Sequence, residues 1–319
     1  MGYAASRNKK PVFSILIPSF NDASYIEQCV LSVLTSSRPE FEVILCDDNS
    51  EDNSLEIVRR IDDPRIKIFR SENRLGAIAN WLNCLNKASG EWVQFLGSDD
   101  FYEEGSVDII LDSLNQNGAI YTLPLKCFSD RTKKIIDIQA TPEKIQMIFG
   151  QSGRESWKGL LKNFNHDELS MTIYPRELVH IFEKLKQEST HSAWIYWVIA
   201  IYYKAKIVSL SRGAIMKRYD HIGIRAQWGE VNTDKKNVTA FNLTGCVGDV
   251  YNSFILAYHF KDVGLLFDLL FKNRLHETKK GGLYGLMSRN SPYTTLGALV
   301  TLVLFPAILI GKTLRDVLK

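Results

Sequence analysis

The sequence has no long run of lysine and arginine, and its formal net charge is only +3 over 319 residues. This charge pattern lacks the dense basic footprint of a nucleic-acid binder, so we expect no nucleic-acid partner. The five cysteines are an odd number, lie far apart and form no C-x-x-C pair. They argue against a disulfide framework or a zinc site and predict buried, reduced thiols.

Other common signals are also missing. No G-x-G-x-x-G follows the first apolar run, residues 12–18, which argues against a Rossmann dehydrogenase. No G-K-[ST] opens a predicted helix, which argues against a P-loop protein. The N-terminus, MGYAASRNKK, lacks the apolar core of a signal peptide and favours a cytosolic protein. The glycosylation-type sequons at Asn237 and Asn242 are therefore interpreted as incidental.

Apolar residues, in contrast, make up 45% of the chain, enough for one large domain or a domain with an appendage. In the first hundred residues, short apolar runs alternate with helical patterns. The predicted strands are 12–18, 41–46, 65–70 and 91–96, and the predicted helices are 25–34, 54–61 and 77–88. This alternation predicts an α/β fold with a mostly parallel central sheet and helices on both faces.

The pattern is weaker after residue 105. Helices are predicted at 106–115, 141–149 and 191–205, strands at 119–126, 133–138, 170–174 and 206–209, a basic loop at 211–235, and helical stretches over 237–275. We therefore predict a larger α/β domain over 10–235, with halves 10–105 and 106–235, and a C-terminal helical region over 236–319.

Residues 294–311 form an apolar segment of eighteen residues without a charge, followed by Lys312, Arg315 and Lys319. This length is at the lower limit for crossing a bilayer, and Pro306 interrupts it. A buried terminal helix pair is one interpretation. We favour the other, a membrane-associating segment whose cationic end stays with anionic headgroups on the cytoplasmic side.

Polar side chains follow each of the first four predicted strands, and in a parallel sheet ligands collect at that edge. The first strand ends at Pro18 and Ser19, and the next three are followed by Asp47 and Asp48, Asn73 and Arg74, and Asp99 and Asp100. A carboxylate at position 47 or 48 could accept an N–H of a pyrimidine base. An Asp-rich turn that caps the next helix is the plainer interpretation of DDNS taken alone.

The adjacent pair Asp99 and Asp100 favours the ligand-binding interpretation over the helix cap. Two neighbouring carboxylates repel one another, and they stay ionised most easily where a cation, hydrogen-bond donors or solvent compensates them. A divalent cation that bridges carboxylates and a nucleotide diphosphate satisfies this need, and both Mg²⁺ and Mn²⁺ accept oxygen ligands. The pattern therefore predicts a site for a nucleotide diphosphate and its metal ion.

The segments FSILIPSFND, VILCDDNSEDNS and NRLGAIANWLNCLNKASGEWVQFLGSDD, within residues 12–105, together resemble the amino-terminal half of a family 2 glycosyltransferase. This is the inverting class with the nucleotide-diphospho-sugar transferase fold called GT-A. The resemblance implies that 10–105 binds the nucleotide and 106–235 the acceptor. It implies an enzyme, of the hexosyltransferase type, that uses Mn²⁺ or Mg²⁺ to transfer a sugar from a nucleotide-diphospho-sugar donor.

The resemblance also implies roles for single residues. The donor-binding residues are Pro18, Ser19, Asp47, Asp48, Arg74, Asn80, Trp81, Ser98 and Asp99, and the metal-binding residues are Asp99 and Asp100. Trp81 could equally be a core residue, because aromatic residues at helical spacing usually are. Gly97 departs from the commoner metal motif, which begins with Asp, and leaves the remaining pair to bind the metal ion.

Inverting transfer needs a general base that takes the proton of the acceptor hydroxyl. Members of the family generally place Asp or Glu at the start of a helix in the second half, whereas this chain has His191 there. A histidine, with a pKa near 6.5, is a competent base at neutral pH. His191 is our first candidate, with a helix-capping or acceptor-contacting role as the alternative, and Asp167 and Glu168 are the next candidates.

A weaker resemblance links the chain to bacterial enzymes that add sugars to lipid-linked O-antigen units. We therefore expect a lipid-linked saccharide acceptor, contact with the membrane surface and a location at the cytoplasmic face of the bacterial inner membrane, in O-antigen or capsule synthesis. Lys217, Arg218, His221 and Arg225 form a basic segment that either contacts a diphosphate or is simply solvated.

Two other functions stay open. A nucleotidylyltransferase of related fold would need a Gly-rich, Lys-containing loop after the first strand, where this chain has PSFNDAS. A catalytically silent, membrane-bound scaffold with the same fold would bind a nucleotide but have lost its general base.

Overall fold

The computed structural model describes residues 10–115, 118–140, 170–187, 192–203, 205–218, 243–267 and 269. The chain divides into two compact units, one of Met1–Glu183 with Trp197–Lys236 and one of Lys184–Tyr196 with Asn237–Lys319. The predicted helix at 141–149 and the apolar segment 294–311 lie outside the described residues. Within the described ranges, no helix is both long enough and apolar enough to cross a membrane.

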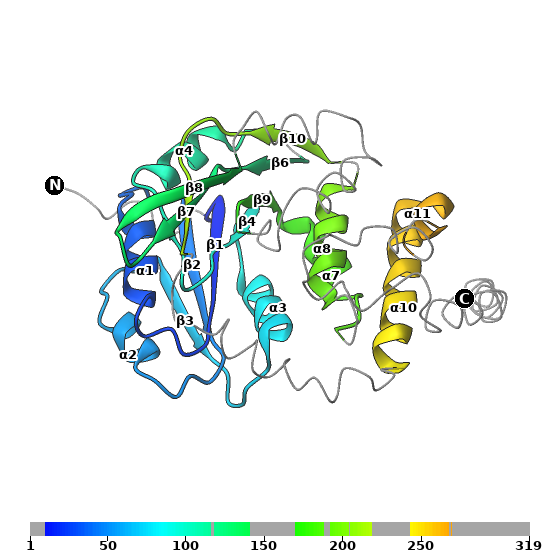
Figure 1. Cartoon of the computed structure of the whole chain (residues 1–319), viewed down its shortest axis with the longest axis horizontal. Helices are drawn as coiled ribbons and strands as arrows, with labels where there is room; N and C mark the ends of the chain where they lie inside the picture. Colours follow the sequence, from blue (N-terminus) through cyan, green and yellow to red (C-terminus); the bar gives the residue numbers. More distant parts are fainter. Residues whose placement is uncertain are drawn as a thin grey trace. The chain divides into compact units, whose positions relative to one another are not determined.

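A seven-stranded sheet, in the order β10-β6-β9-β4-β1-β2-β3, forms the core of the first unit (Figure 1). Its strands are β1 (Phe13–Ser19), β2 (Phe41–Asp47), β3 (Ile66–Arg70), β4 (Trp92–Phe95), β6 (Ala119–Thr122), β9 (Thr172–Pro175) and β10 (Lys206–Ser209). Strand β1 runs parallel to β2 and β4, β2 to β3, and β10 to β6. Only β9 runs antiparallel to its neighbours, so the sheet is mostly parallel, as predicted.

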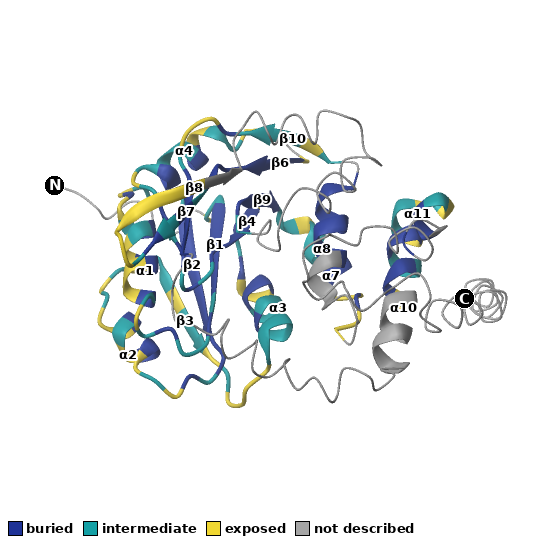
Figure 2. Ribbon diagram, viewed as in Figure 1, coloured by how far each residue is buried: buried dark blue, intermediate teal, exposed yellow. Residues whose placement is uncertain are grey.

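The central strands explain the apolar runs of the sequence. Ile15, Leu16 and Ile17 of β1 are fully buried, and so are Val43 and Ile44 of β2. Strands of a parallel sheet are covered on both faces, so their sequences are continuously apolar instead of alternating. Figure 2 shows these buried strands and, in yellow, the exposed residues 134–137 of β8.

Helices cover both faces of this sheet, with α1 and α2 on one side and α3 on the other (Figure 1). The first helices along the chain are α1 (Ile26–Leu34), α2 (Ser54–Arg59), α3 (Ala77–Lys87) and α4 (Ser106–Ser113). Further along the chain are the 3-10 turn η1 (Arg176–Leu178), α7 (Val179–Phe182) and α8 (Ser192–Tyr202). Cys29, Cys46, Cys84 and Cys127 are buried free thiols, which confirms that prediction for these four cysteines.

A second sheet of four strands has the order β5-β11-β7-β8. It comprises β5 (Phe101–Tyr102), β7 (Leu125–Ser129), β8 (Lys134–Ala140) and β11 (Ile215–Arg218). The single strand predicted over 119–126 was wrong, because it divides at Pro124 into β6 of the first sheet and β7 of the second. Pro124 has no N–H, and its carbonyl accepts the N–H of Ile215 at 3.0 Å, so the chain changes sheets there.

Strand β11 is the second correction. Residues 211–235 were predicted to be a loop, but Lys217 and Arg218 lie in a strand that pairs parallel with β7 and antiparallel with β5. Both side chains are buried. Two consecutive cationic residues usually indicate a solvent-exposed segment. Such residues are buried only when they have partners, and here the partners come from distant parts of the chain.

The second unit contains α10 (Leu243–Phe260) and α11 (Val263–Phe267), which confirms helices in this part of the chain. The buried Asn252 side chain accepts the N–H of Lys186 at 2.6 Å and donates to the Lys186 carbonyl at 3.0 Å. Asp262 Oδ1 accepts the N–H of Leu265 at 3.0 Å, which caps the start of α11.

Candidate functional site

The carboxyl ends of β1, β2 and β4 lie side by side. Strand β1 lies between the other two, with Ser19 aligned to Asp47 of β2 and Leu16 aligned to Phe95 of β4. Asp47 is the last residue of β2, and the segment Gly97–Asp100 follows β4 closely. This segment is hereafter called the metal loop, after the metal ligands predicted in it. The sheet topology therefore brings the polar groups predicted at the strand ends to one edge.

Asp48 is buried just beyond β2, and its carboxylate holds the loop that precedes α3. Oδ1 accepts the N–H of Leu75 at 2.6 Å, and Oδ2 accepts the N–H of Gly76 at 2.9 Å. Gly76 has a φ of +85°, a conformation that residues with side chains rarely adopt. Each carboxylate oxygen has more than one lone pair, so Asp48 can still accept an N–H of a ligand.

Three buried oxygen atoms beside Asp48 have no hydrogen-bond partner among the described residues: Ser19 Oγ, Asp47 Oδ1 and Asn80 Oδ1. In two of these side chains the second polar atom is hydrogen-bonded. Asp47 Oδ2 accepts the N–H of Ser50 at 3.1 Å. Asn80 Nδ2 donates to the Cys46 carbonyl at 2.9 Å. Buried polar atoms are rarely left unsatisfied in folded proteins. Three of them around the ends of β1 and β2 therefore indicate a place where a polar ligand or water binds.

Arg74, the cation predicted near the donor, lies at the exposed side of this group. Its guanidinium carbon is 4.0 Å from the centre of the Phe20 ring, a cation–π contact. Phe20 directly follows β1. The contact places a positive charge beside the end of the central strand.

The metal loop turns two carboxylates toward one point. A Cβ atom added to Gly97 would lie 2.9 Å from Asp99 Oδ1 and 3.1 Å from Asp100 Oδ2. The other oxygen of Asp100 accepts the N–H of Arg218 at 3.0 Å. A side chain at position 97 would occupy this space, which gives a physical reason for the glycine.

This arrangement suits a divalent cation that also has a second source of ligands. Two anionic oxygens close together are the hard ligands that Mg²⁺ and Mn²⁺ prefer. No group of three His, Cys, Asp or Glu residues able to hold a metal ion occurs in the described part of the chain. Asp99 and Asp100 stay the predicted ligands, and oxygens of a bound diphosphate could complete the set.

Asp22 is a site residue that the sequence reasoning missed. Its Oδ2 accepts a hydrogen bond from Ser98 Oγ in the metal loop, and the N–H of Phe20 lies 3.4 Å from the same atom. Burial raises the pKa of the Asp22 carboxyl to about 6; the bond from Ser98 opposes this shift, and the charge of Asp99 adds to it. No local sequence signal reveals a contact across 76 residues.

Trp81 lies in an aromatic cluster on the α3 side of the sheet. Its ring centre is 5.3 Å from that of Phe95 and 6.0 Å from that of Trp197. Trp197 stacks on Phe182 at 4.8 Å. These contacts describe a packing role, and a donor-binding role for Trp81 stays a prediction.

The predicted general bases are not among the described residues. His191, Asp167 and Glu168 all lie outside them, and α8 begins at Ser192, the residue after His191. Their roles stay predictions.

A family model described as "Glycosyl transferase family 2" matches residues 14–182. The chain is 34% identical over 140 residues to an uncharacterized glycosyltransferase of Haemophilus influenzae, a match that covers 43% of this chain and 56% of that protein. It is 34% identical over 112 residues to the GalNAc(5)-diNAcBac-PP-undecaprenol beta-1,3-glucosyltransferase of Campylobacter jejuni, covering 34% of this chain and 36% of that protein. The chain thus spans about half, or less, of these curated relatives.

Among solved structures, the chain is similar to residues 1–349 of S. aureus TarS in complex with UDP-GlcNAc. The TM-score is 0.51 at 19% sequence identity, and the match covers 81% of this chain and 75% of that one. The similarity confirms the predicted GT-A fold.

Proposed function

Because the chain belongs to glycosyl transferase family 2, we propose that it transfers one sugar from a nucleotide-diphosphate donor to a saccharide acceptor, with inversion. One observation carries this proposal. The two parts that a nucleotide diphosphate needs flank the end of β1, with Asp48 after β2 on one side and Asp99 and Asp100 after β4 on the other.

Asp48 would select the base. Its carboxylate accepts hydrogen bonds and donates none, and the amides of Leu75 and Gly76 fix its orientation. It therefore favours a base that presents an N–H at its edge, such as uracil or thymine. The TarS structure holds UDP-GlcNAc, which makes UDP-sugars the first donors to test.

The unpaired oxygens of Ser19, Asp47 and Asn80 lie close to Asp48 in the fold and would receive further donors of the nucleoside. Arg74 would add positive charge at the exposed side. Both groups would hold and orient the donor. Less entropy then has to be lost when the sugar is transferred.

Asp99 and Asp100 would hold a Mn²⁺ or Mg²⁺ ion, and such an ion neutralises the charge that develops on the departing diphosphate. Ser98 and the amide of Arg218 keep the loop in position, through Asp22 and Asp100 respectively. The carboxylates are thus oriented before the donor binds.

His191 is our first candidate for the general base that takes the proton from the acceptor hydroxyl, and Asp167 and Glu168 are the next. A general base contributes roughly 10²- to 10⁴-fold to turnover. Turnover that falls by this factor in His191→Ala, while UDP binding is kept, supports the assignment.

We propose a lipid-linked saccharide acceptor at the cytoplasmic face of the bacterial inner membrane, in synthesis of a surface polysaccharide. Two observations support it. The name of the Campylobacter jejuni relative includes an undecaprenol diphosphate, and the sequence of this chain carries the apolar segment 294–311 before three cations. A protein that lies on the membrane meets a membrane-anchored acceptor at high effective concentration.

The test is release of UDP from UDP-sugars, measured with and without Mn²⁺. We expect release that needs the metal ion, stops with EDTA and is lost in Asp100→Ala. Asp112→Asn is the matched control, because Asp112 is an exposed carboxylate on α4 that pairs with Arg38 and should leave release unchanged.

The possible outcomes separate the functions. Binding of UDP without any turnover would favour the silent scaffold, and formation of diphosphate from a nucleoside triphosphate would favour a nucleotidylyltransferase. UDP release that is equal in Asp100→Ala and the wild type, or that persists in EDTA, would overturn the proposed metal-assisted transfer.

A further inference from the structure

Arg218, the last residue of β11, is buried although its charge is permanent, with only 3% of the residue exposed. Its Nη1 donates to Asp130 Oδ1, and its Nη2 donates to Gln28 Oε1. The rings of Tyr25 and Phe101 lie 4.9 and 5.0 Å from the guanidinium carbon. Groups from α1, the residue before it, β5 and the turn after β7 therefore hold this one side chain.

The backbone of the same residue holds the metal loop. The N–H of Arg218 donates to Asp100 Oδ1 at 3.0 Å. Asp100 Oδ2 lies instead 3.1 Å from the position that a Cβ atom at Gly97 would take, and Asp99 Oδ1 lies 2.9 Å from the same position. One oxygen of Asp100 is thus fixed, and the other is aimed at the position proposed for the cation.

A role in packing alone does not account for this arginine. Buried ion pairs contribute little net stability, and apolar residues of similar size often replace them without loss. Arg218 Nε is also buried without a hydrogen-bond partner among the described residues, which adds an energetic cost. The burial of this cation is unfavourable, yet its guanidinium is held at several points. Such an arrangement is expected for a residue whose backbone has to stay in one position.

We propose that Arg218 is a positioning residue for the metal loop. Its anchored guanidinium fixes the end of β11, and the amide there fixes the carboxylate of Asp100. This inference rests on the proposed function, because it concerns the same metal ion and donor. Groups that orient a metal ligand typically contribute about 10- to 100-fold to metal affinity.

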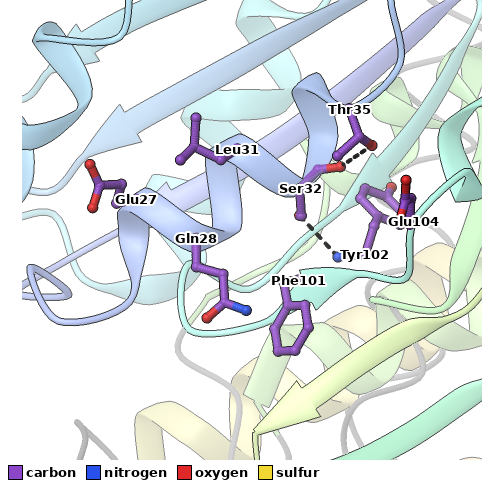
Figure 3. A pocket seen from close by; sticks show the side chains of 8 residues that line it. All are labelled: Glu27, Gln28, Leu31, Ser32, Thr35, Phe101, Tyr102 and Glu104. Atoms are coloured by element: carbon purple, nitrogen blue, oxygen red, sulfur yellow. Dashed lines mark hydrogen bonds between the residues drawn. The ribbon is translucent and has the colours of Figure 1, made fainter.

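Gln28 offers a substitution that leaves the core intact. Figure 3 shows Gln28 on α1 beside Phe101 of β5, among the residues that line a pocket of about 430 Å³. Because the Gln28 residue is largely exposed, Gln28→Ala removes one anchor of the guanidinium without burying a new cavity. It is therefore a milder test than a change at Arg218 itself.

The experiment measures Mn²⁺ affinity in the presence of saturating UDP, by electron paramagnetic resonance of free Mn²⁺. We expect about 10-fold weaker Mn²⁺ binding in Arg218→Lys, which keeps the charge but not the two-armed contact, and a few-fold weaker binding in Gln28→Ala. UDP affinity without metal should stay at the wild-type value. If Arg218 had only a packing role, its substitution would not weaken Mn²⁺ binding while leaving UDP binding unchanged.

Lys133→Met is the matched control. Lys133 is an exposed cation that also pairs with Asp130, at 3.1 Å, whereas Arg218 joins Asp130 to the metal loop through its own backbone. Removal of the Lys133 charge should leave the Mn²⁺ affinity unchanged.

The outcomes also separate this inference from the proposed function. If the wild-type protein binds neither UDP nor, in the presence of UDP, Mn²⁺, both the proposed function and this inference are wrong. A wild-type protein that binds both, with an unchanged Mn²⁺ affinity in folded Gln28→Ala and Arg218→Lys, defeats this inference alone. If Arg218→Lys does not fold, the Gln28→Ala result decides.

Discussion

The buried carboxyl of Asp22 should make the folded protein less stable at neutral pH than in mild acid. Its pKa is about 6 in the folded protein, against an ordinary value of 3.8 for an unfolded chain. Because the folded state holds the proton more tightly, the contribution of Asp22 to stability is fully present below pH 3.8. It is lost as the pH rises through about 6.

The magnitude follows from the two pKa values. Their difference is about 2 units, and each unit is worth about 1.4 kcal/mol, so full ionisation costs about 3 kcal/mol of unfolding free energy. Asp22→Asn removes the ionisation but keeps the size of the side chain and an oxygen that can accept the Ser98 hydroxyl. The variant should therefore be more stable than the wild type at pH 8, by up to about 3 kcal/mol.

The assay is urea unfolding followed by tryptophan fluorescence between pH 4 and 8, in the presence of a chelator. We expect the gap between Asp22→Asn and the wild type to shrink toward zero as the pH falls to 4. Asp112→Asn, at an exposed carboxylate, should follow the wild type at every pH. A gap that does not change with pH would refute the argument, because it would show that Asp22 titrates alike in both states.

The remaining predictions concern the two parts of the site. Gly97→Ala should weaken Mn²⁺ binding about 10-fold, measured with UDP present, because the new Cβ would displace the oxygens of Asp99 and Asp100 while the fold stays intact. Asp48→Asn should lose about 1–3 kcal/mol of stability in urea unfolding, because an NH₂ group then faces a backbone N–H, and it should also lose UDP binding in calorimetry. Gly76→Ala should cost about 1 kcal/mol or more in the same unfolding assay, since its φ is +85°; an unchanged stability would contradict that reasoning.

The sequence predicts the first four strands well, because burial on both faces leaves a physical signature in each. The run 12–18 becomes β1 at Phe13–Ser19, and 41–46 becomes β2 at Phe41–Asp47. The shared edge of the sheet follows from their parallel order, so the position of Asp48, Asp99 and Asp100 at that edge is also foreseeable.

The parts that sequence reasoning misses are those set by distant partners. Lys217 and Arg218 look like solvent-exposed cations, and only the folded chain brings Asp130 and Gln28 to the guanidinium. The bond between Arg218 and Asp100 joins residues 118 positions apart. Asp22 looks like a helix cap for the same reason, because its partner Ser98 lies on another loop.

The metal loop, with Leu96 before it, also joins β4 of the larger sheet to β5 of the smaller one, and β5 begins immediately after Asp100. This has a consequence for protein engineering. A library that varies β8, at the outer edge of the smaller sheet, leaves that junction alone, whereas mutations in β5 or β11 act on Asp100 directly. Libraries meant to change the proposed specificity should therefore vary β8 and hold residues 101–102 and 215–218 constant.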